Sequence, residues 1–156
     1  MNCRSRFTVA VVLAGALGLG AVPHPQYSVE VPFEYSRTFG LMLIKAEING
    51  KPAVMVVDTG SNETIVSPRL VVVKRLNSKN AVATAKGSGF SGSGITATAF
   101  LRIGSFDPKN CEILVMDLRD LAKTLGQNVD GILGLNVLKE FESVGIDLKR
   151  HKLILK

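Results

Sequence analysis

The chain has 156 residues, a formal net charge of +6 and 46% hydrophobic residues. Such a length allows one domain with a substantial buried core but does not allow two. The basic residues are scattered, and their densest group, Lys149, Arg150 and Lys152, has no interleaved aromatic residues that could stack on bases. The composition therefore argues against nucleic-acid binding.

The first 22 residues differ in kind from the rest of the chain. Arg4 and Arg6 precede an uncharged stretch over residues 7–22, and Pro23 follows as a helix stop. A basic start, an apolar stretch and small residues near its end are typical of a secretory signal peptide. The stretch is long for a cleaved signal and short for a membrane span, so an uncleaved membrane anchor is the alternative.

This interpretation sets the expected compartment and the extent of the folded part. We expect a secreted or periplasmic protein, or one anchored to a membrane if residues 1–22 stay attached. Without them the chain keeps 17 basic and 13 acidic residues, a net charge of +4. Residues 23–35 are expected to form an N-terminal strand and linker, and residues 36–156 the main domain.

The cysteines and histidines give no catalytic or metal-binding arrangement. Cys3 falls within the expected signal, which leaves Cys111 alone and predicts no internal disulfide. We interpret Cys111 as a small core residue rather than a nucleophile. His24 lies beside the signal and His151 lies in a terminal turn, where we expect it to be solvent-exposed. No metal site is expected.

From residue 27 onward the chain has the pattern of short strands separated by turns. Asn49-Gly50 is a typical two-residue hairpin turn, and Pro32 favours an edge position for the first strand. Many short strands predict a small, mainly antiparallel β-barrel or sandwich. The expected strands cover residues 29–35, 41–48, 53–57, 64–66, 82–86, 95–103, 111–116, 146–148 and 153–155.

Few segments have helical spacing. Residues 117–126 predict a helix of one or two turns that ends at a glycine, and residues 137–141 predict a second one with Asn136 as its N-cap. The apolar run within residues 68–76 fits a short helix or a strand equally well. Residues 77–80 are expected to form a turn.

The stretch from residue 53 to residue 66 carries the chemistry. An apolar, strand-forming run ends abruptly at Asp58, and residues 59–62 then supply turn-forming types before the strand pattern resumes at Thr64. The carboxylate is therefore expected at the tip of a tight loop between buried strands. Such a frame makes ionisation of a carboxyl group costly unless hydrogen bonds or a second charge intervene, which suits it to acid and base chemistry.

Asp58-Thr59-Gly60-Ser61, placed after an apolar run, resembles the active-site loop of aspartic proteases. The chain is short and has a single copy of this motif, and in this it resembles the retropepsin-like branch of that family. Residues 129–138 resemble the family's downstream hydrophobic-hydrophobic-Gly element, here Ile132, Leu133 and Gly134. In the family this element passes behind the active-site loop and packs against it.

The resemblance covers residues 36–156 and includes a closing strand at 145–148. The order and separation of these segments match bacterial, non-viral, single-domain members. The resemblance therefore implies a mainly β fold, a retropepsin-like closed β-barrel with one or two short helices.

The resemblance also implies a mechanism and an assembly. Aspartic proteases use two aspartates that share a proton, one activating a water and the other donating to the carbonyl oxygen. One chain supplies only Asp58, so two copies must meet across the twofold axis of a homodimer. In the family, Thr59 bonds across the subunits, Gly60 lets the carboxylates approach, and Ser61 bonds the outer carboxylate oxygen.

The glycine-rich segment at residues 86–94 has two interpretations. Gly87, Gly89 and Gly92 satisfy a dinucleotide-binding pattern, but a strand follows where that pattern needs a helix, so no nucleotide cofactor is expected. The resemblance implies a mobile substrate-binding flap formed by Gly87, Gly89, Phe90, Gly92 and Gly94. The alternative is a surface loop with no role.

Other residues qualify the resemblance. Asn62 occupies a position where the family more often has a small residue. Leu135 occupies a position where viral members have an arginine that stabilises the dimer. Asp130 and Asp147 are interpreted as structural, capping or turn residues. The sequence thus predicts an aspartic endopeptidase that acts as a homodimer on peptide or protein substrates without metal or cofactor. The alternative is a catalytically silent retropepsin-fold module for binding or assembly.

Overall fold

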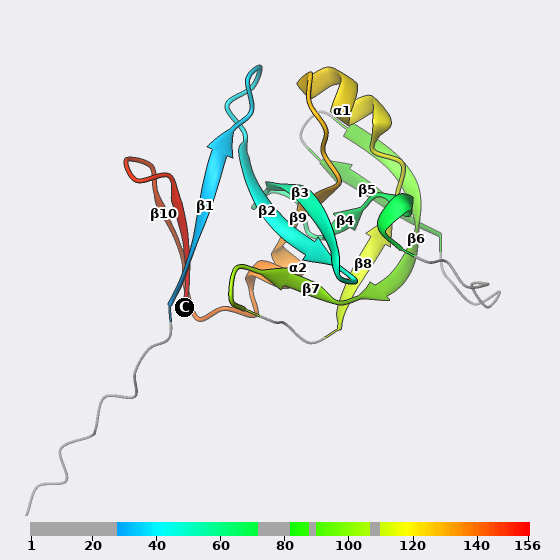
Figure 1. Cartoon of the computed structure of the whole chain (residues 1–156). Coiled ribbons are helices and arrows are strands. Elements are labelled where there is room, and N and C mark those ends of the chain that lie inside the picture. Colours follow the sequence, from blue (N-terminus) through cyan, green and yellow to red (C-terminus); the bar gives the residue numbers. More distant parts are fainter. Residues whose placement is uncertain (1–27, 72–81, 88–89, 107–109) are drawn as a thin grey trace, which may run out of the picture.

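The computed structural model describes residues 28–71, 82–87, 90–106 and 110–156. Strands dominate this part of the chain, and its helices are short (Figure 1). The strands are β1 (Val29–Tyr35), β2 (Met42–Ile48), β3 (Lys51–Val57), β4 (Ile65–Val66), β5 (Val82–Gly87), β6 (Phe90–Ala99), β7 (Leu101–Ile103), β8 (Cys111–Val115), β9 (Gly131–Leu133), β10 (Val144–Asp147) and β11 (Lys152–Leu155). The helices are α1 (Arg119–Leu125) and α2 (Leu135–Leu138), with a 3-10 turn, η1, at Pro68–Leu70. The predicted mainly β fold with short helices is confirmed.

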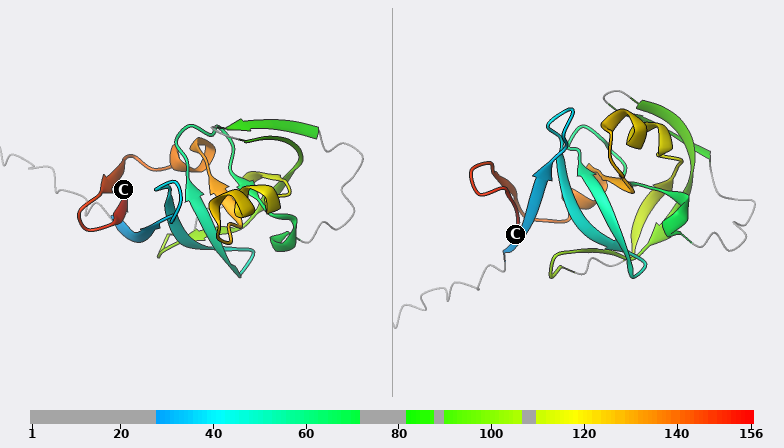
Figure 2. Two further views of the ribbon diagram at one scale, coloured as in Figure 1. Left: turned by 90° about the horizontal axis from the view of Figure 1, so that it is seen from above. Right: turned by 45° about the horizontal axis from the view of Figure 1, so that its top comes forward.

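The strands join in one sheet whose order is β10-β11-β1-β2-β3-β9-β4-β8-β6-β5, with β7 paired to β2. Most neighbours are antiparallel, but β9 runs parallel to β3, and β8 runs parallel to β4. Figure 2 shows β10 and the β5–β6 hairpin at opposite ends of the molecule. The described pairing is thus an open path, and the closed barrel that the resemblance implied is not found in it.

The β2–β3 hairpin forms as predicted at Asn49-Gly50. Both turn residues have positive φ, 51° at Asn49 and 76° at Gly50, which is the conformation that a tight two-residue hairpin turn requires. The strand register then pairs Ile48 with Lys51 and continues to Leu43 opposite Val56. The hairpin therefore fixes the direction and register of β3, the strand that leads to Asp58.

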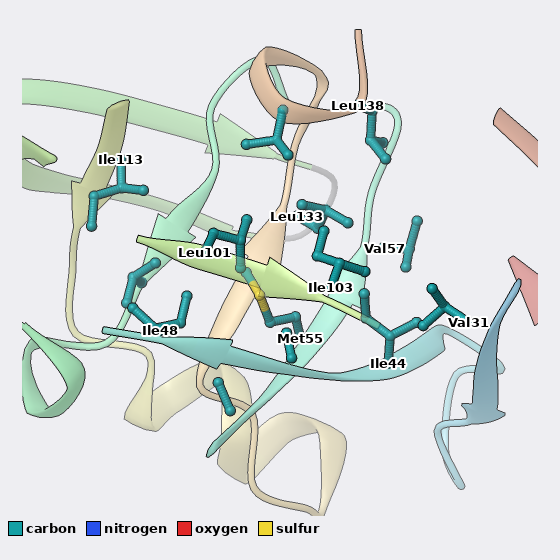
Figure 3. Close-up of a cluster of buried hydrophobic side chains, with 14 of the residues drawn as sticks. Val31, Ile44, Ile48, Met55, Val57, Leu101, Ile103, Ile113, Leu133 and Leu138 are labelled. Atoms are coloured by element: carbon teal, nitrogen blue, oxygen red, sulfur yellow. The ribbon is translucent and has the colours of Figure 1, made fainter. Parts of the chain in front are cut away.

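Strand β3 is buried on both faces, which explains its continuous apolar run. Met55 and Val57 belong to the main hydrophobic core, whereas Val56 packs into a second cluster on the other side. Figure 3 shows part of the main core, with side chains from β2, β3 and β7 and, as Leu133, from β9. A strand held by neighbours on both edges and by side chains on both faces gives a rigid base for the loop that follows.

Two of the expected strands differ from the structure. The strand expected at 95–103 is divided at Phe100, which lies between the end of β6 and the start of β7, and β7 pairs with β2. β1 is not an edge strand, because it pairs with both β11 and β2; Pro32 lies where the partner changes, as the last residue paired with β11. The prediction of an edge position is therefore wrong for β1 as a whole.

The second helix was misplaced by the prediction. α2 covers Leu135–Leu138 rather than 137–141, and Gly134 is its N-cap residue. Asn136 lies inside the helix and does not cap it, because its amide group has partners elsewhere in the fold. α1, in contrast, ends at Gly126 in a left-handed conformation, as predicted.

Some predictions fall outside the described residues. They are the signal segment at 1–22, the turn at 77–80, Gly89, and residues 72–76 of the segment with two interpretations. The beginning of that segment, Pro68–Leu70, forms the 3-10 turn.

Candidate active site

Asp58 directly follows β3, at the start of the loop that leads to β4. Its backbone N–H donates to Leu133 O at 3.1 Å, which continues the parallel pairing of β3 with β9 by one residue. The side chain is partly buried. The structure therefore places Asp58 where the sequence predicted it, at the junction of a buried strand and a tight loop.

The carboxylate is held by the loop that follows it. Asp58 Oδ1 accepts a hydrogen bond from Gly60 N at 2.8 Å, and Asp58 O accepts one from Ser61 N at 3.3 Å. A Cβ atom at Gly60 would lie 3.2 Å from Asp58 Oδ1. Thr59 and Gly60 are exposed in the single chain. The residues next to the carboxylate therefore have small side chains and are exposed, as the approach of a second loop would require.

Ser61 has a different partner from the one the resemblance implied. Its side chain is 3% exposed, and its hydroxyl donates to Glu63 O at 2.8 Å. Its carbonyl oxygen accepts from Leu135 N at 2.8 Å. In the single chain, Ser61 thus stabilises the loop itself and does not bond the Asp58 carboxylate.

The loop is bound to the beginning of α2. The first N–H groups of a helix have no partner inside the helix, and here the loop supplies acceptors for them. Leu135 N donates to Ser61 O, Asn136 N donates to Asn62 O at 3.0 Å, and Gly134 N donates to Thr64 Oγ1 at 3.1 Å. These three bonds attach successive parts of the loop to one helical turn.

The hydrophobic-hydrophobic-Gly element lies behind the loop, as the resemblance implied. Ile132 and Leu133 are buried in β9, which lies between β3 and β4. Gly134 must be glycine, because a Cβ atom there would collide with the carbonyl group of Glu63 and would lie 3.0 Å from Ser61 O. The close contact between the loop and this element therefore depends on the missing side chain.

Sequence reasoning missed two residues of the site, Thr64 and Asn136. Thr64 is fully buried, and its N–H and hydroxyl both donate to Asn136 Oδ1, at 2.8 Å and 2.7 Å. Asn136 Nδ2 donates to Glu112 O of β8 at 2.7 Å. In the sequence, the only sign of this bridge was a polar residue, Asn136, among the apolar residues of a short helix. An asparagine at that place fits a helix cap equally well.

The described parts of the glycine-rich segment lie in a hairpin of β5 and β6. β5 and β6 pair from Val82 opposite Ile95 to Gly87 opposite Phe90. β6 also pairs with β8, but only from Ile95 onward. A Cβ atom at Gly94 would lie 2.7 Å from Leu114 Cγ and Val115 O, so Gly94 allows β6 to cross β8 closely. The role of Gly87, Gly89, Phe90, Gly92 and Gly94 over a substrate stays a prediction.

Asp130 and Asp147 are structural, as predicted. Asp130 is 6% exposed; its Oδ2 accepts from Val54 N at 3.0 Å, and its Oδ1 accepts from Arg69 Nε at 3.0 Å, within an ion pair. Asp147 Oδ1 accepts from the backbone N–H groups of Lys149 and Arg150 in the terminal turn.

The remaining candidates are His151 and Cys111. His151 is an exposed turn residue, as predicted, and its ring stacks on Phe33 with centroids 5.4 Å apart. Cys111 begins β8 and packs partly buried against the main core; burial raises the pKa of its thiol, and the nearby Glu140 carboxylate raises it further. Within the described ranges, no group of three or more His, Cys, Asp or Glu residues could hold a metal ion. No helix in the part of the chain that the structure describes is long and apolar enough to cross a membrane.

We compared the chain with known protein families, with known proteins and with solved structures. A family described as aspartyl protease matches residues 44–137, more than half of the chain. The chain is 33% identical over 135 residues to DNA damage-inducible protein 1 of Neurospora crassa and 31% identical over 137 residues to that of Candida glabrata. These alignments cover 83% and 82% of this chain but only 28% of each relative, so the chain spans less than a third of their length.

The crystal structure of a retropepsin-like aspartic protease from Rickettsia conorii is similar with a TM-score of 0.55. The match covers 83% of this chain and 91% of that one at 21% sequence identity, which shows a shared fold. The family match and the position of Asp58 at the end of β3 agree with this likeness. The chain therefore belongs to the aspartyl protease family, and it shares the fold of a retropepsin-like member.

Proposed function

We propose that the protein is an aspartic endopeptidase that hydrolyses peptide bonds in peptide or protein substrates. The observation that carries this proposal is the placement of Asp58 in a loop that is fixed by β9 on one side and by α2 on the other. A catalytic group needs such a rigid support, because a small displacement from the productive geometry lowers the rate strongly.

The proposed reaction needs a second carboxyl group. Two Asp58 side chains, one from each subunit of a homodimer, would share one proton because two like charges so close cannot both ionise. The ionised carboxylate would take a proton from the attacking water, while the protonated one would donate to the carbonyl oxygen of the scissile bond. The two carboxyl groups would exchange these roles as the intermediate collapses.

The dimer is part of this proposal. An isologous interface places the same loop of each subunit against its mate. The exposed Thr59 and Gly60 next to the carboxylate support such an approach, since they offer a hydroxyl group and an unobstructed backbone. Thr59 is proposed to bond across the interface. Export of the chain, with residues 1–22 as a signal, is also proposed, and N-terminal sequencing of the exported protein tests it.

The test compares two carboxylate-to-amide variants. Asp58→Asn should abolish cleavage of a peptide library while circular dichroism and the urea midpoint stay those of the wild type. Asp120→Asn is the matched control, because Asp120 is an exposed residue of α1 whose carboxylate pairs with Lys123 of the same helix, and it should keep wild-type cleavage. Pepstatin binding to the wild type would be a second sign of the paired carboxyl groups.

Two results would count against the proposal. Full activity in Asp58→Asn would exclude the aspartic mechanism. A folded wild-type dimer that cleaves no peptide across the library, from acidic to neutral pH, would favour the silent binding or assembly module instead.

A further inference from the structure

We infer that Asn136 is the positioning residue of the active-site loop, because its amide group ties Thr64 at the end of that loop to strand β8. Asn136 is the second residue of α2 and is partly buried. Its Oδ1 accepts from Thr64 N at 2.8 Å and from Thr64 Oγ1 at 2.7 Å, and its Nδ2 donates to Glu112 O at 2.7 Å. One side chain thus contacts the loop and the neighbouring strand at once.

The chemistry of the partners fixes the orientation of this amide. Thr64 N–H can only donate, so it must face Oδ1, and the Glu112 carbonyl can only accept, so it must face Nδ2. The Thr64 hydroxyl accepts from Gly134 N, which directs its own proton to Asn136 Oδ1. In each of these three bonds a donor therefore meets an acceptor, and turning the amide by 180° would break all three.

Thr64 is held on all its polar groups. Besides the three bonds of its N–H and hydroxyl, its carbonyl oxygen accepts from Leu114 N at 2.9 Å. The side chain is fully buried, so water cannot replace a lost partner without opening the structure. The end of the Asp58 loop therefore has one arrangement as long as the Asn136 amide is in place.

The tie to β8 extends to the β5–β6 hairpin. Glu112 lies opposite Thr98 of β6 in the β6–β8 ladder, and β6 continues beyond Gly94 into the hairpin with β5. The Asn136 amide therefore sets the position of the Asp58 loop relative to the strand pair on which the hairpin stands. Loss of either end of the amide would let the loop move independently of that pair.

This inference rests on the proposed proteolysis for its catalytic consequence. A moved loop changes the separation of the two Asp58 carboxyl groups, and hence both the rate and the pH dependence of the shared-proton state. Substrate contacts distant from the loop change little. We therefore expect an effect on kcat and on its pH profile that is larger than the effect on KM.

The experiment uses variants that remove one end of the amide bridge at a time. Asn136→Asp keeps an acceptor for Thr64 but faces Glu112 O with a second oxygen, and Thr64→Val removes the hydroxyl at nearly constant shape. Both should lower kcat about tenfold or more and shift its pH profile, with KM changed less than about twofold. Thr64→Ser, which keeps the hydroxyl, should retain more of kcat than Thr64→Val does.

Ile103→Val is the matched control, because it removes one methyl group from a fully buried residue of β7. Among the described residues, Ile103 makes no hydrogen bond to the loop or to α2; its strand pairs with β2. It should leave kcat and the pH profile unchanged. Wild-type kcat and pH profile in folded Asn136→Asp and Thr64→Val would overturn the inference, as would equal effects of Ile103→Val.

A second measurement separates this inference from the proposed function. Amide hydrogen exchange is followed at Thr64 and Gly134 in the Asp58→Asn background, where no cleavage is needed. Asn136→Asp should speed exchange at Thr64 about tenfold or more relative to exchange in β2, whereas Ile103→Val should not. If no variant cleaves any peptide, selective exchange at Thr64 still supports the positioning role, and unchanged exchange there refutes it.

Discussion

At the scale of single residues, the position of each side chain in the Asp58 loop is set by its hydrogen-bond partners. Asp58 is placed by one backbone bond to Leu133 and by the Gly60 N–H on its carboxylate. Ser61 has the hydroxyl that the family pattern requires, yet in the single chain this hydroxyl is bound to Glu63 O. The sequence could predict these residues because they are contiguous, but it could not predict which atoms they contact.

Cys111 allows a prediction about pH at this scale. Burial is the larger cause of its raised pKa and the Glu140 carboxylate is the smaller one, so the folded state favours the neutral thiol. The resulting stabilisation is fully present below the ordinary pKa of a thiol and is lost as the pH rises from that value through the raised pKa of the folded state, because in this range the unfolded chain ionises first. Alkylation follows the thiolate, so its pH midpoint should be higher in the folded protein than in urea.

The measurement is iodoacetamide labelling of Cys111 as a function of pH, followed by mass spectrometry of the peptide that contains it. Restricted access alone would lower the rate at every pH and leave the midpoint unchanged. Equal midpoints in the folded and the urea-unfolded chain would therefore contradict the raised pKa.

At the scale of elements, the site depends on how closely β9 and α2 approach the loop. Gly134 joins the two elements, and a Cβ atom there would meet the backbone of Glu63 rather than a movable side chain. Backbone cannot give way without moving the whole loop, and this is the costly kind of overpacking. The hydrophobic-hydrophobic-Gly element therefore requires its glycine because of a contact with a segment far earlier in the chain, the same segment that Gly134 N reaches through its bond to Thr64, 70 residues before it.

Gly134→Ala should lower the free energy of unfolding by about 2 kcal/mol or more. Gly145→Ala is the matched control, because its added Cβ would lie 3.6 Å from Ile154 Cβ, an ordinary contact, and its φ is not positive. It should change stability by less than about 1 kcal/mol. Urea unfolding of both variants, monitored by circular dichroism, gives the comparison. A loss in Gly134→Ala no larger than in Gly145→Ala would show that the loop is free to move away.

The sequence could predict the elements whose signals are local. Asn49-Gly50 specifies a turn, and the apolar run before Asp58 specifies a buried strand, because both depend on neighbouring residues. The position of α2 was predicted wrongly for the opposite reason. Asn136 fits an N-cap by type, but distant groups, Thr64 and Glu112, bind its amide and draw it into the helix. Local sequence patterns likewise do not predict close contacts between distant strands, such as the one between Gly94 and Leu114.

At the scale of the whole molecule, the sheet runs from β10 to β5 and places the Asp58 loop near the middle of its strand order. The loop follows β3, the hairpin comes from β5 and β6, and the element behind the loop comes from β9. The family and the fold could be predicted because two short motifs carry them, whereas barrel closure depends on strand contacts that no motif specifies. The chain supplies one Asp58, and the proposed chemistry therefore requires two chains.

The central claim, a catalytic site shared by two Asp58 residues, is tested most directly by mixing wild-type protein with Asp58→Asn under conditions where subunits exchange. If each active site needs both carboxyl groups, only wild-type pairs cleave, and an equal mixture at fixed total protein should retain about a quarter of the activity of pure wild type. Analytical ultracentrifugation of the same samples would verify that they are dimers. Retention of about half of the activity would mean that each chain cleaves independently, and it would contradict a shared site.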